Sequence, residues 1–251
     1  MAKQTGIFQI KGTLENVTFY KSADGYKVRK KGGVTKERIM NDPAYARTRE
    51  NLSQFGLSAK AGKLLRSSIP SLLKKGKDSR VSSRLSKIMS EIAKNDHESP
   101  RGKKKVAIGI DSTQGINLLK GFNFNKRANF ETIFSCPYEI DMAAGEIIIS
   151  NIIVEEQIDA PQGATHVGFR SAFTAINFKT SEYDTSYSKS QVFPINLNPQ
   201  DITLSPQKIP SAGEDAKMMV MMLVEFYQEV DEVQYPLSNG AHNTLAILEI
   251  A

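Results

Sequence analysis

The sequence predicts an α+β protein with an N-terminal β-hairpin arm, a helical hairpin and a C-terminal antiparallel β-sandwich. Three observations support this prediction. In residues 1–40, apolar and polar residues alternate and glycines interrupt the pattern. In residues 41–98, apolar residues recur at helical spacing. Residues 111–251 contain many short apolar runs that are separated by turn residues. Short strands without intervening helices indicate an antiparallel sandwich or barrel rather than βαβ units. Residues 99–110 are basic and contain Pro100 and Gly102, so we expect a linker and a domain boundary there.

The arm of residues 1–40 contains the clearest hairpin of the chain. Residues 17–21 and 26–30 alternate, and the Asp24-Gly25 pair between them tolerates the positive φ that a tight turn needs. A glycine-bounded apolar run over residues 6–12 predicts a further strand. Gly32-Gly33 ends the arm. A strand on such a tether can complete an unpaired sheet edge, so we expect the arm to add a strand to a neighbouring copy.

The helical hairpin begins at Asp42-Pro43, because Asp is a good N-cap and Pro is tolerated at the first helical position. Spacings of three and four then place one set of residues on a single narrow face, where small side chains allow a partner helix or the β half to approach closely. After Gly76, a second helix starts with Asp78 or Ser79 as its cap. The two apolar faces are Tyr45, Thr48, Leu52, Phe55, Ala59 and Gly62, and Val81, Leu85, Ile88 and Ile92.

The β-sandwich is predicted from nine runs, with turns at 143–145, 161–163 and 238–240. Residues 218–226 are apolar on both faces, which predicts a central strand with methionines as core filler. The predicted strands are 118–124, 130–134, 138–142, 146–153, 165–169, 172–178, 191–197, 218–230 and 244–250.

Charge is segregated along the chain. Residues 1–110 carry 25 Lys and Arg against 9 Asp and Glu, whereas residues 111–251 carry 8 against 18, so net charges of +16 and −10 underlie the overall +6. This asymmetry suits head-to-tail association of copies. It equally suits nucleic-acid binding by the basic half, and lysines that merely solvate helix faces are the plain alternative. We expect a basic interaction surface at Lys21, Lys27, Arg29, Lys30, Arg47 and Arg49, and an acidic one at Glu155, Glu156, Glu229, Asp231 and Glu232.

Catalytic, cofactor and metal sites are not predicted. The three histidines, His97, His166 and His242, lack metal-ligand spacing, and Cys136 is the single cysteine, so an internal disulfide is impossible. The carboxylates are adjacent or alternate along strands, as on a solvated acidic face. Apolar runs are shorter than the ~20 residues of a membrane span, and the N-terminus lacks an apolar signal region. We therefore expect a cytoplasmic, non-enzymatic protein, or one released by lysis as an assembly or virion component.

Several motifs lie near the two ends of the chain: Lys11-Gly12-Thr13, Thr18-Phe19-Tyr20-Lys21, Asp24-Gly25-Tyr26, Asn41-Asp42-Pro43-Ala44, Arg47-Thr48-Arg49-Glu50-Asn51, Phe226-Tyr227-Gln228-Glu229-Val230 and Asn239-Gly240-Ala241. With these motifs the chain resembles a family of proteins of similar length from Bacteroidota genomes that has no established activity. The resemblance implies no functional residues. The favoured hypothesis is a structural protein that self-assembles into rings or filaments. The alternative is a nucleic-acid-associated protein of phage or mobile-element origin.

Overall fold

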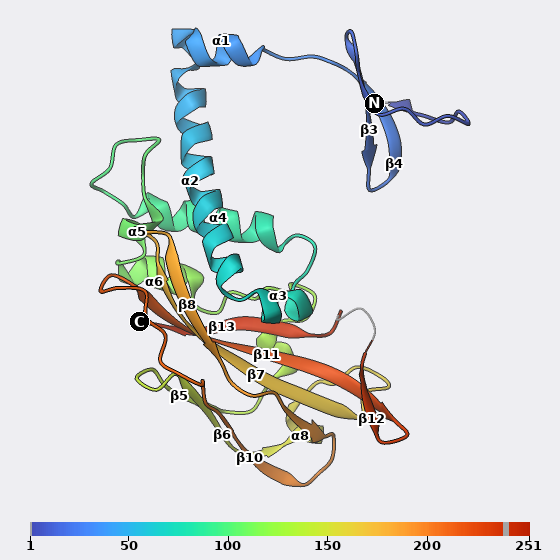
Figure 1. Cartoon of the computed structure of the whole chain (residues 1–251), viewed down its shortest axis with the longest axis vertical. Coiled ribbons are helices and arrows are strands. Elements are labelled where there is room, and N and C mark those ends of the chain that lie inside the picture. Colours follow the sequence, from blue (N-terminus) through green and yellow to red (C-terminus); the bar gives the residue numbers. More distant parts are fainter. Residues whose placement is uncertain (1, 238–240) are drawn as a thin grey trace. The chain divides into compact units, whose positions relative to one another are not determined.

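The computed structural model describes residues 2–237 and 241–251 and has the predicted α+β class, with N-terminal strands, central helices and a C-terminal antiparallel β half (Figure 1). The chain forms two compact units, Met1–Glu50 and Asn51–Ala251. The division lies within helix α2, not at residues 99–110. That expected boundary is corrected because the helices and the β half share one hydrophobic core. Two features predicted at 238–240, the turn and part of the Asn239-Gly240-Ala241 motif, lie outside the described residues.

The N-terminal unit contains the predicted hairpin in a four-stranded sheet. Its strands are β1 (Ala2–Lys3), β2 (Gly12–Leu14), β3 (Val17–Ser22) and β4 (Gly25–Lys30), in the order β1-β4-β3-β2. Phe19 pairs with Val28 and Tyr20 with Lys27, and Gly25 has φ +104°, as a tight turn requires. After the sheet come α1 (Lys36–Asn41) and a 3₁₀ turn, η1 (Pro43–Tyr45), whose N-cap Asp42 accepts a hydrogen bond from the Ala44 N–H.

The strand predicted over residues 6–12 is wrong. The Gln4 side chain binds both backbone groups of Ile10, accepting from its N–H at 2.9 Å and donating to its carbonyl at 3.1 Å. One side-chain amide thus takes the place of a neighbouring strand and closes a loop. Ile7 and Phe8 within this loop are 96% and 87% exposed.

Three helices occupy the region of the predicted hairpin: α2 (Ala46–Ser68), α3 (Pro70–Gly76) and α4 (Val81–Lys94). The apolar face predicted on α4 is buried, including Val81, Leu85 and Ile92. The face predicted on α2 is buried only at Gly62, since Leu52 and Phe55 are exposed, and the other buried residues of α2 are Ser58, Leu65 and Ser68. At Gly62 α2 packs against α4, and a Cβ there would make ordinary contact with Leu85 at 3.4 Å.

Three short helices follow where a linker and two strands were predicted: α5 (Val106–Gly109), α6 (Thr113–Leu119) and α7 (Phe130–Ile133). The side chains of Ser112 and Asn129 cap α6 and α7 by accepting N–H groups of Gly115 and Glu131. The cap at Asn129 favours helix over strand at 130–134. At 118–124 the strand prediction is wrong in part: α6 ends at Leu119, and the backbone of residues 121–124 makes hydrogen bonds to β13. The basic segment before α5 is held by Asp96, whose carboxylate accepts the N–H groups of Glu98, Ser99 and Lys105.

The β half contains a six-stranded and a three-stranded antiparallel sheet. In the larger sheet, β11 and β7 pair along their length from Lys217↔Ile176 to Tyr227↔His166. β13 and β12 share the free edge of β11, and β8 and β9 share that of β7; the smaller sheet has the order β10-β6-β5. The elements are β5 (Glu139–Asp141), β6 (Glu146–Ile153), α8 (Val154–Gln157), β7 (His166–Asn177), β8 (Glu182–Tyr187), β9 (Gln191–Pro194), β10 (Pro199–Leu204), β11 (Lys217–Val230), β12 (Val233–Pro236) and β13 (Thr244–Ile250).

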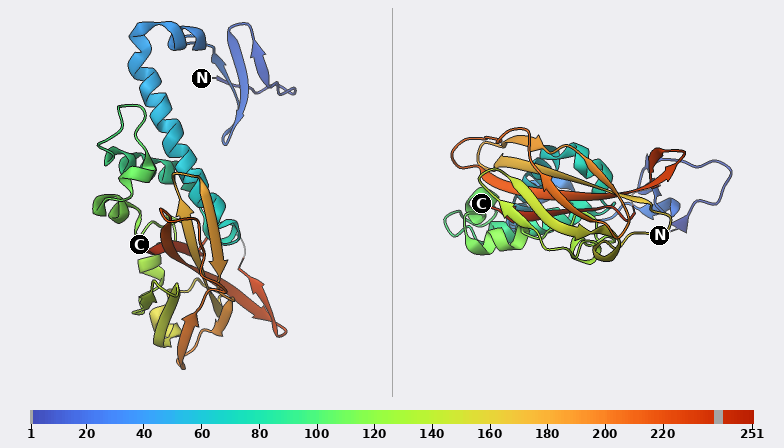
Figure 2. Two further views of the ribbon diagram at one scale, coloured as in Figure 1. Left: turned by 60° about the vertical axis from the view of Figure 1, so that its left-hand side comes forward. Right: turned by 90° about the horizontal axis from the view of Figure 1, so that it is seen from below.

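The second unit is layered, with helices on one face of the six-stranded sheet and the three-stranded sheet on the other (Figures 1 and 2). Alternate residues of β11 enter the two cores. Met219, Met221 and Leu223 face the helices, while Val220 and Met222 face the smaller sheet. The prediction of a central strand with methionine as core filler is confirmed. Burial on both faces explains why this strand lacks polar alternation.

Candidate functional site

The basic side chains expected on the arm hairpin lie over aromatic rings or beside one carboxylate. The Lys21 ammonium lies 5.6 Å from the Tyr26 ring centre, and the Arg29 guanidinium 5.5 Å from that of Tyr20. Lys27 binds Asp24 at 2.8 Å, and this hydrogen bond is the main reason that the pKa of Asp24 is lowered. Lys30 is exposed beyond them. The hairpin therefore presents cations held by cation–π contacts on both of its faces.

Arg47 and Arg49 differ in role, although both were expected on the basic surface. Arg47 is exposed and binds Glu50 at 2.8 Å, one helical turn away. Arg49 is half-buried and donates to the carbonyl oxygens of Ile39 and Asp42 at 2.8 and 2.9 Å. Those carbonyls end α1, so Arg49 satisfies groups that the helix leaves unpaired and has a structural role.

The expected acidic residues gather at one end of the six-stranded sheet. Glu155 and Glu156 are exposed in α8, while Glu229, Asp231 and Glu232 lie on the exposed end of the β11–β12 hairpin. Hydrogen bonds connect these two elements through the backbone. The Glu155 N–H donates to Asn196, the Ile195 N–H to Thr165, and the Glu229 N–H to the Thr165 hydroxyl.

The end of the β11–β12 hairpin also exposes apolar side chains. Val230 pairs directly with Val233, and Gln228 with Tyr235, so these four side chains share one face. Val230 and Val233 are each 50% exposed and Tyr235 is 54% exposed. The two residues that make the turn, Asp231 and Glu232, have φ of +51° and +62°. Positive φ is unusual for non-glycine residues and costs free energy, most clearly for Glu232.

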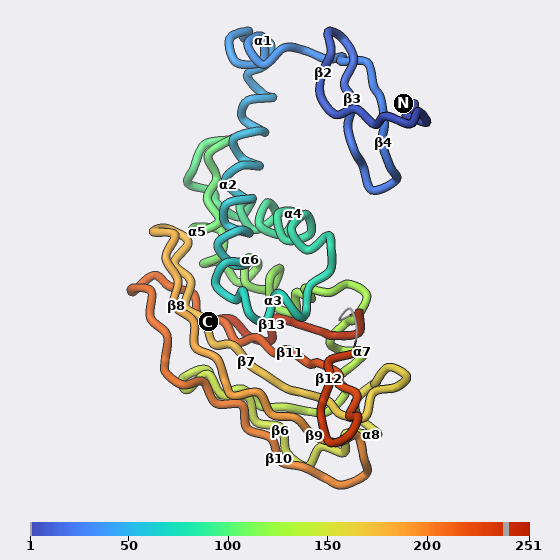
Figure 3. The backbone as a smooth tube through the Cα atoms, turned by 45° about the vertical axis from the view of Figure 1, so that its right-hand side comes forward, coloured from blue at the N-terminus to red at the C-terminus, as the bar shows by residue number. Residues whose placement is uncertain are grey.

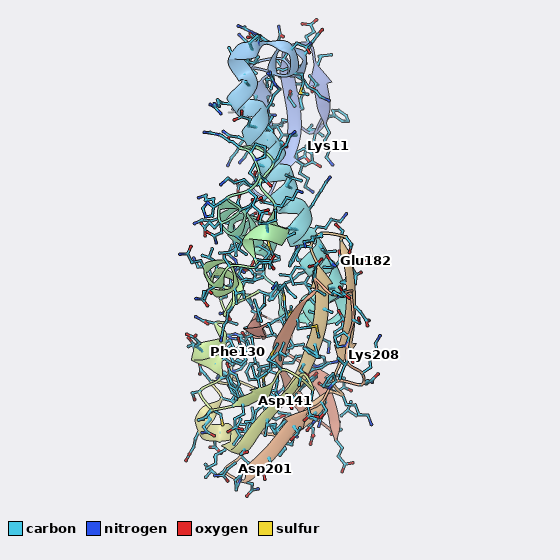
Figure 4. All side chains as sticks on the ribbon, turned by 90° about the vertical axis from the view of Figure 1, so that its left-hand side faces the viewer. Lys11, Phe130, Asp141, Glu182, Asp201 and Lys208 are labelled. Atoms are coloured by element: carbon cyan, nitrogen blue, oxygen red, sulfur yellow. The ribbon has the colours of Figure 1, made fainter. Side chains whose placement is uncertain are left out.

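Ion pairs show how far the two charged halves neutralise each other within one copy. Lys75 reaches from α3 to Glu225 on β11 at 2.9 Å, and the Glu225 side chain is only 4% exposed. Other pairs stay within one half, such as Lys87–Glu91 and Lys208–Asp184. Several other carboxylates accept hydrogen bonds from backbone N–H groups of their own half of the chain. Two such carboxylates are labelled in Figure 4: Asp141 accepts the N–H of Ala143 in the turn that follows it, and Asp201 on β10 accepts the N–H of Asn151 on the neighbouring strand β6.

A groove of about 450 Å³ lies in the second unit where three distant segments meet. Leu57, Lys60, Ala61 and Leu64 form one face of α2, residues 105–108 supply the start of α5, and Phe178, Lys179 and Ser181 come from the β7–β8 turn. Its walls are apolar and its polar groups include three lysines. Lys179 lies 3.1 Å from Asp215, whereas Lys60 and Lys105 have no ion pair among the described residues. Sequence reasoning missed this groove because its segments are far apart in the chain.

Several kinds of site are not seen in the part of the chain that the structure describes. Residues 2–237 and 241–251 contain no group of three or more His, Cys, Asp or Glu placed to hold a metal ion. In the same residues, no helix is both long and apolar enough to cross a bilayer. Cys136 is buried, which raises the pKa of its thiol, and a buried thiol of raised pKa is a poor nucleophile.

Comparison with known proteins does not supply a relative: no protein-family model matches the chain, and neither a curated protein nor a solved structure matches it significantly.

Proposed function

We propose that this protein is a structural subunit that self-associates, with the basic arm and helices of one copy contacting the acidic β half of the next. The products are rings or filaments, depending on whether the rotation between successive copies closes. The proposal rests on a single observation, which is that the N-terminal unit lacks a hydrophobic core. Among residues 2–50, all of which the structure describes, none is buried.

Lack of a core makes the N-terminal unit an unusual independent domain. Units of about 50 residues are marginal on their own and commonly rely on disulfides, metals or oligomerisation. Residues 1–50 contain no cysteine. Ile7, Phe8, Ile10 and Leu14 are all exposed, and an apolar side chain gains roughly 1.5–3 kcal/mol when it is fully buried. Covering these side chains with a second copy would supply the core that the unit lacks.

Charge supports the same arrangement. Residues 1–50 carry 11 Lys and Arg against 5 Asp and Glu, a net of +6, while residues 111–251 have a net charge of −10. Complementary surfaces orient approaching copies and speed their association. The contribution of each exposed pair is small, about 0.2–1 kcal/mol, so the charges select orientation and the apolar residues provide most of the affinity.

Sedimentation velocity and negative-stain electron microscopy on nuclease-treated protein test the proposal. We expect assemblies larger than a monomer at micromolar concentration, and a variant that lacks residues 1–33 should assemble at least tenfold more weakly. A second variant replaces only Ile7 and Phe8 with Ser, which leaves the net charge unchanged, and it should also assemble more weakly because the apolar side chains provide most of the affinity. Monomers at every concentration would refute self-association, and unchanged assembly of the truncated chain would remove the arm from the mechanism.

Nucleic-acid binding is the second candidate, because one specific observation favours it. One face of the arm hairpin combines Tyr20, Lys27 and Arg29, with Lys21 and Lys30 on the other face. Aromatic rings beside cations are what single-stranded nucleic acids stack on and pair with. The chain has no Trp and eight Tyr, so copurifying nucleic acid would dominate its ultraviolet spectrum. Binding whose affinity falls steeply with salt, by a monomer, would favour this candidate over self-association.

A further inference from the structure

The second unit carries two exposed features of matching chemistry at opposite ends. The groove between α2, α5 and the β7–β8 turn is apolar and bears Lys60, Lys105 and Lys179. The β11–β12 hairpin end is apolar on one face, through Val230 and Val233, and carries Glu229, Asp231 and Glu232. Each feature therefore has an apolar centre and charges of one sign, and the two signs are opposite.

The β7–β11 strand pair separates the two features. Lys217 pairs with Ile176 beside the groove, and Tyr227 pairs with His166 beside the hairpin. Ten residue steps at roughly 3.3 Å each give a separation of roughly 33 Å along the strands. Figures 1 and 3 show the same arrangement, with α5 near one end of β7 and β12 near the other. Because both strands are buried in a sheet, the hairpin of one copy cannot reach its own groove.

We infer that the β11–β12 hairpin of one copy docks in the groove of a second copy, with Val230 and Val233 between α2 and Phe178 and the hairpin carboxylates beside the three lysines. This deepens the proposed self-association and rests on it, because it names one pair of surfaces, on α2 and on the acidic β half, that meet in addition to the arm contact. The groove volume lies within the range of roughly 300–1,000 Å³ that accommodates small-molecule ligands, so it has room for the two valine side chains.

The details of both surfaces agree with this pairing. The β7–β8 turn is held in place by Asn177, whose side-chain oxygen accepts the N–H groups of Lys179 and Thr180, so the groove wall is formed before docking. Asp231 and Glu232 hold a left-handed turn that presents the hairpin end to solvent. Since the two surfaces differ, the contact is heterologous, and each copy retains one free groove or hairpin for the next.

Disulfide trapping between two full-length variants tests the contact, because the chain has only the buried Cys136 as background. One variant carries Glu232→Cys and the other Lys60→Cys. We expect mild oxidation of the mixture to produce a crosslinked heterodimer several times faster than Glu232→Cys mixed with the control Glu139→Cys, whose exposed side chain lies on the smaller sheet. Trapping no faster than this control, in protein that still associates, would overturn the docking inference and leave self-association intact.

A second experiment uses charge and does not depend on oxidation. Lys60→Glu with Lys105→Glu makes a groove-reversed variant, and Glu229→Gln with Asp231→Asn and Glu232→Gln makes a hairpin-neutral variant. In sedimentation velocity we expect each alone to associate at least tenfold more weakly than wild type. Their mixture should recover a one-to-one complex, since one retains a hairpin and the other a groove. Wild-type affinity in both variants would overturn the inference, and a wild type that is monomeric throughout would overturn it together with the proposed function.

Discussion

Gly109 provides a sharp test of how the floor of the groove is held. This residue ends α5, where the α5 backbone rests on α4, and a Cβ atom there would overlap the carbonyl oxygen of Ile92 and lie 2.8 Å from its carbon. Both atoms belong to backbone and cannot rotate away. We expect Gly109→Ala to push α5 from α4 and to lower the free energy of unfolding.

The size of the effect follows from the overlap. Ordinary contact begins near 3.4 Å, so relieving the contact with the carbonyl carbon alone needs about 0.6 Å of separation, and relieving the overlap with the oxygen needs more. Gaps of roughly 0.5–1 Å forfeit a quarter to a half of the dispersion energy of the atoms involved. Overpacking in cores costs about 1–3 kcal/mol, and an obstacle made of backbone belongs at the upper end, about 3 kcal/mol. For a unit of this size that corresponds to roughly 6–12 °C in melting temperature.

Urea and thermal unfolding followed by circular dichroism measure this change. Gly56→Ala is the matched control, because Gly56 lies inside α2 with nothing within 4 Å of a Cβ. It should leave stability unchanged or raise it by up to about 1 kcal/mol, since Ala is the better helix former. A Gly109→Ala protein as stable as wild type, beside a normal Gly56→Ala protein, would refute the close packing of α5 on α4.

Two further substitutions probe buried charges. Burial alone would raise the pKa of Asp96, but the N–H groups of Lys105, Ser99 and Glu98 outweigh it and lower the pKa to about 2. A depressed pKa stabilises the fold above the unfolded value of 3.8, so Asp96→Asn should cost about 1–2 kcal/mol near pH 7, and the difference from wild type should shrink between pH 4 and 2; a pH-independent difference in urea titrations would contradict this. Lys75→Met leaves Glu225 buried without its cation and should cost about 2–3 kcal/mol, less than for a fully buried pair because Lys75 is 44% exposed. Adding Glu225→Gln should recover part of the loss in the same assay, and strictly additive losses would show that the pair is not coupled.

Sequence patterns predicted several strands of the β half and the α4 helix. Residues 146–153 and 244–250 coincide with β6 and β13, because apolar runs of β-branched residues and leucine fit strands with one or both faces buried. The strand predicted at residues 130–134 is wrong, because Phe130–Ile133 form the helix α7. Two phenylalanines and an isoleucine suggested a strand, but the cap at Asn129 and burial beside Phe169 allow one helical turn.

The β7 strand illustrates a different limit of local patterns. It was predicted as two strands, 165–169 and 172–178, which the polar pair Arg170-Ser171 separates, and Gly168 lies within the first of them. In the structure, Gly168 makes room for the Tyr227 ring, as a Cβ there would lie 2.8 Å from it, and Arg170 lies over the ring of Tyr187. Both explanations depend on partners that are distant in sequence. The sequence pattern alone therefore suggested a break in the strand at residues whose type is determined by tertiary packing.

Charge segregation indicated that surfaces of opposite sign exist, but it could not say which residues remain available. Arg49 and Lys27 were grouped with Lys30, yet Arg49 caps α1 and Lys27 binds Asp24 within the same hairpin. Conversely, Lys60 and Lys105 were left out of the expected basic surface, because a lysine on a helix face or in a basic linker is ordinary until its neighbours are known. Their neighbours in the groove are apolar, and that combination requires tertiary contacts between α2, α5 and the β7–β8 turn.

The apolar part of the inferred contact decides how it responds to salt. A contact made by charges alone is largely screened near 1 M salt, where the Debye length is about 3 Å. Val230 and Val233 are already half buried in the free hairpin, so docking them fully yields about half of the roughly 1.5–3 kcal/mol available to each, and salt does not screen that term. The charges therefore orient the two copies, and salt weakens that contribution. The buried apolar side chains hold the complex together, and salt does not weaken theirs. Nucleic-acid binding through phosphates lacks this second component, which is why association that persists at high salt distinguishes the two functions.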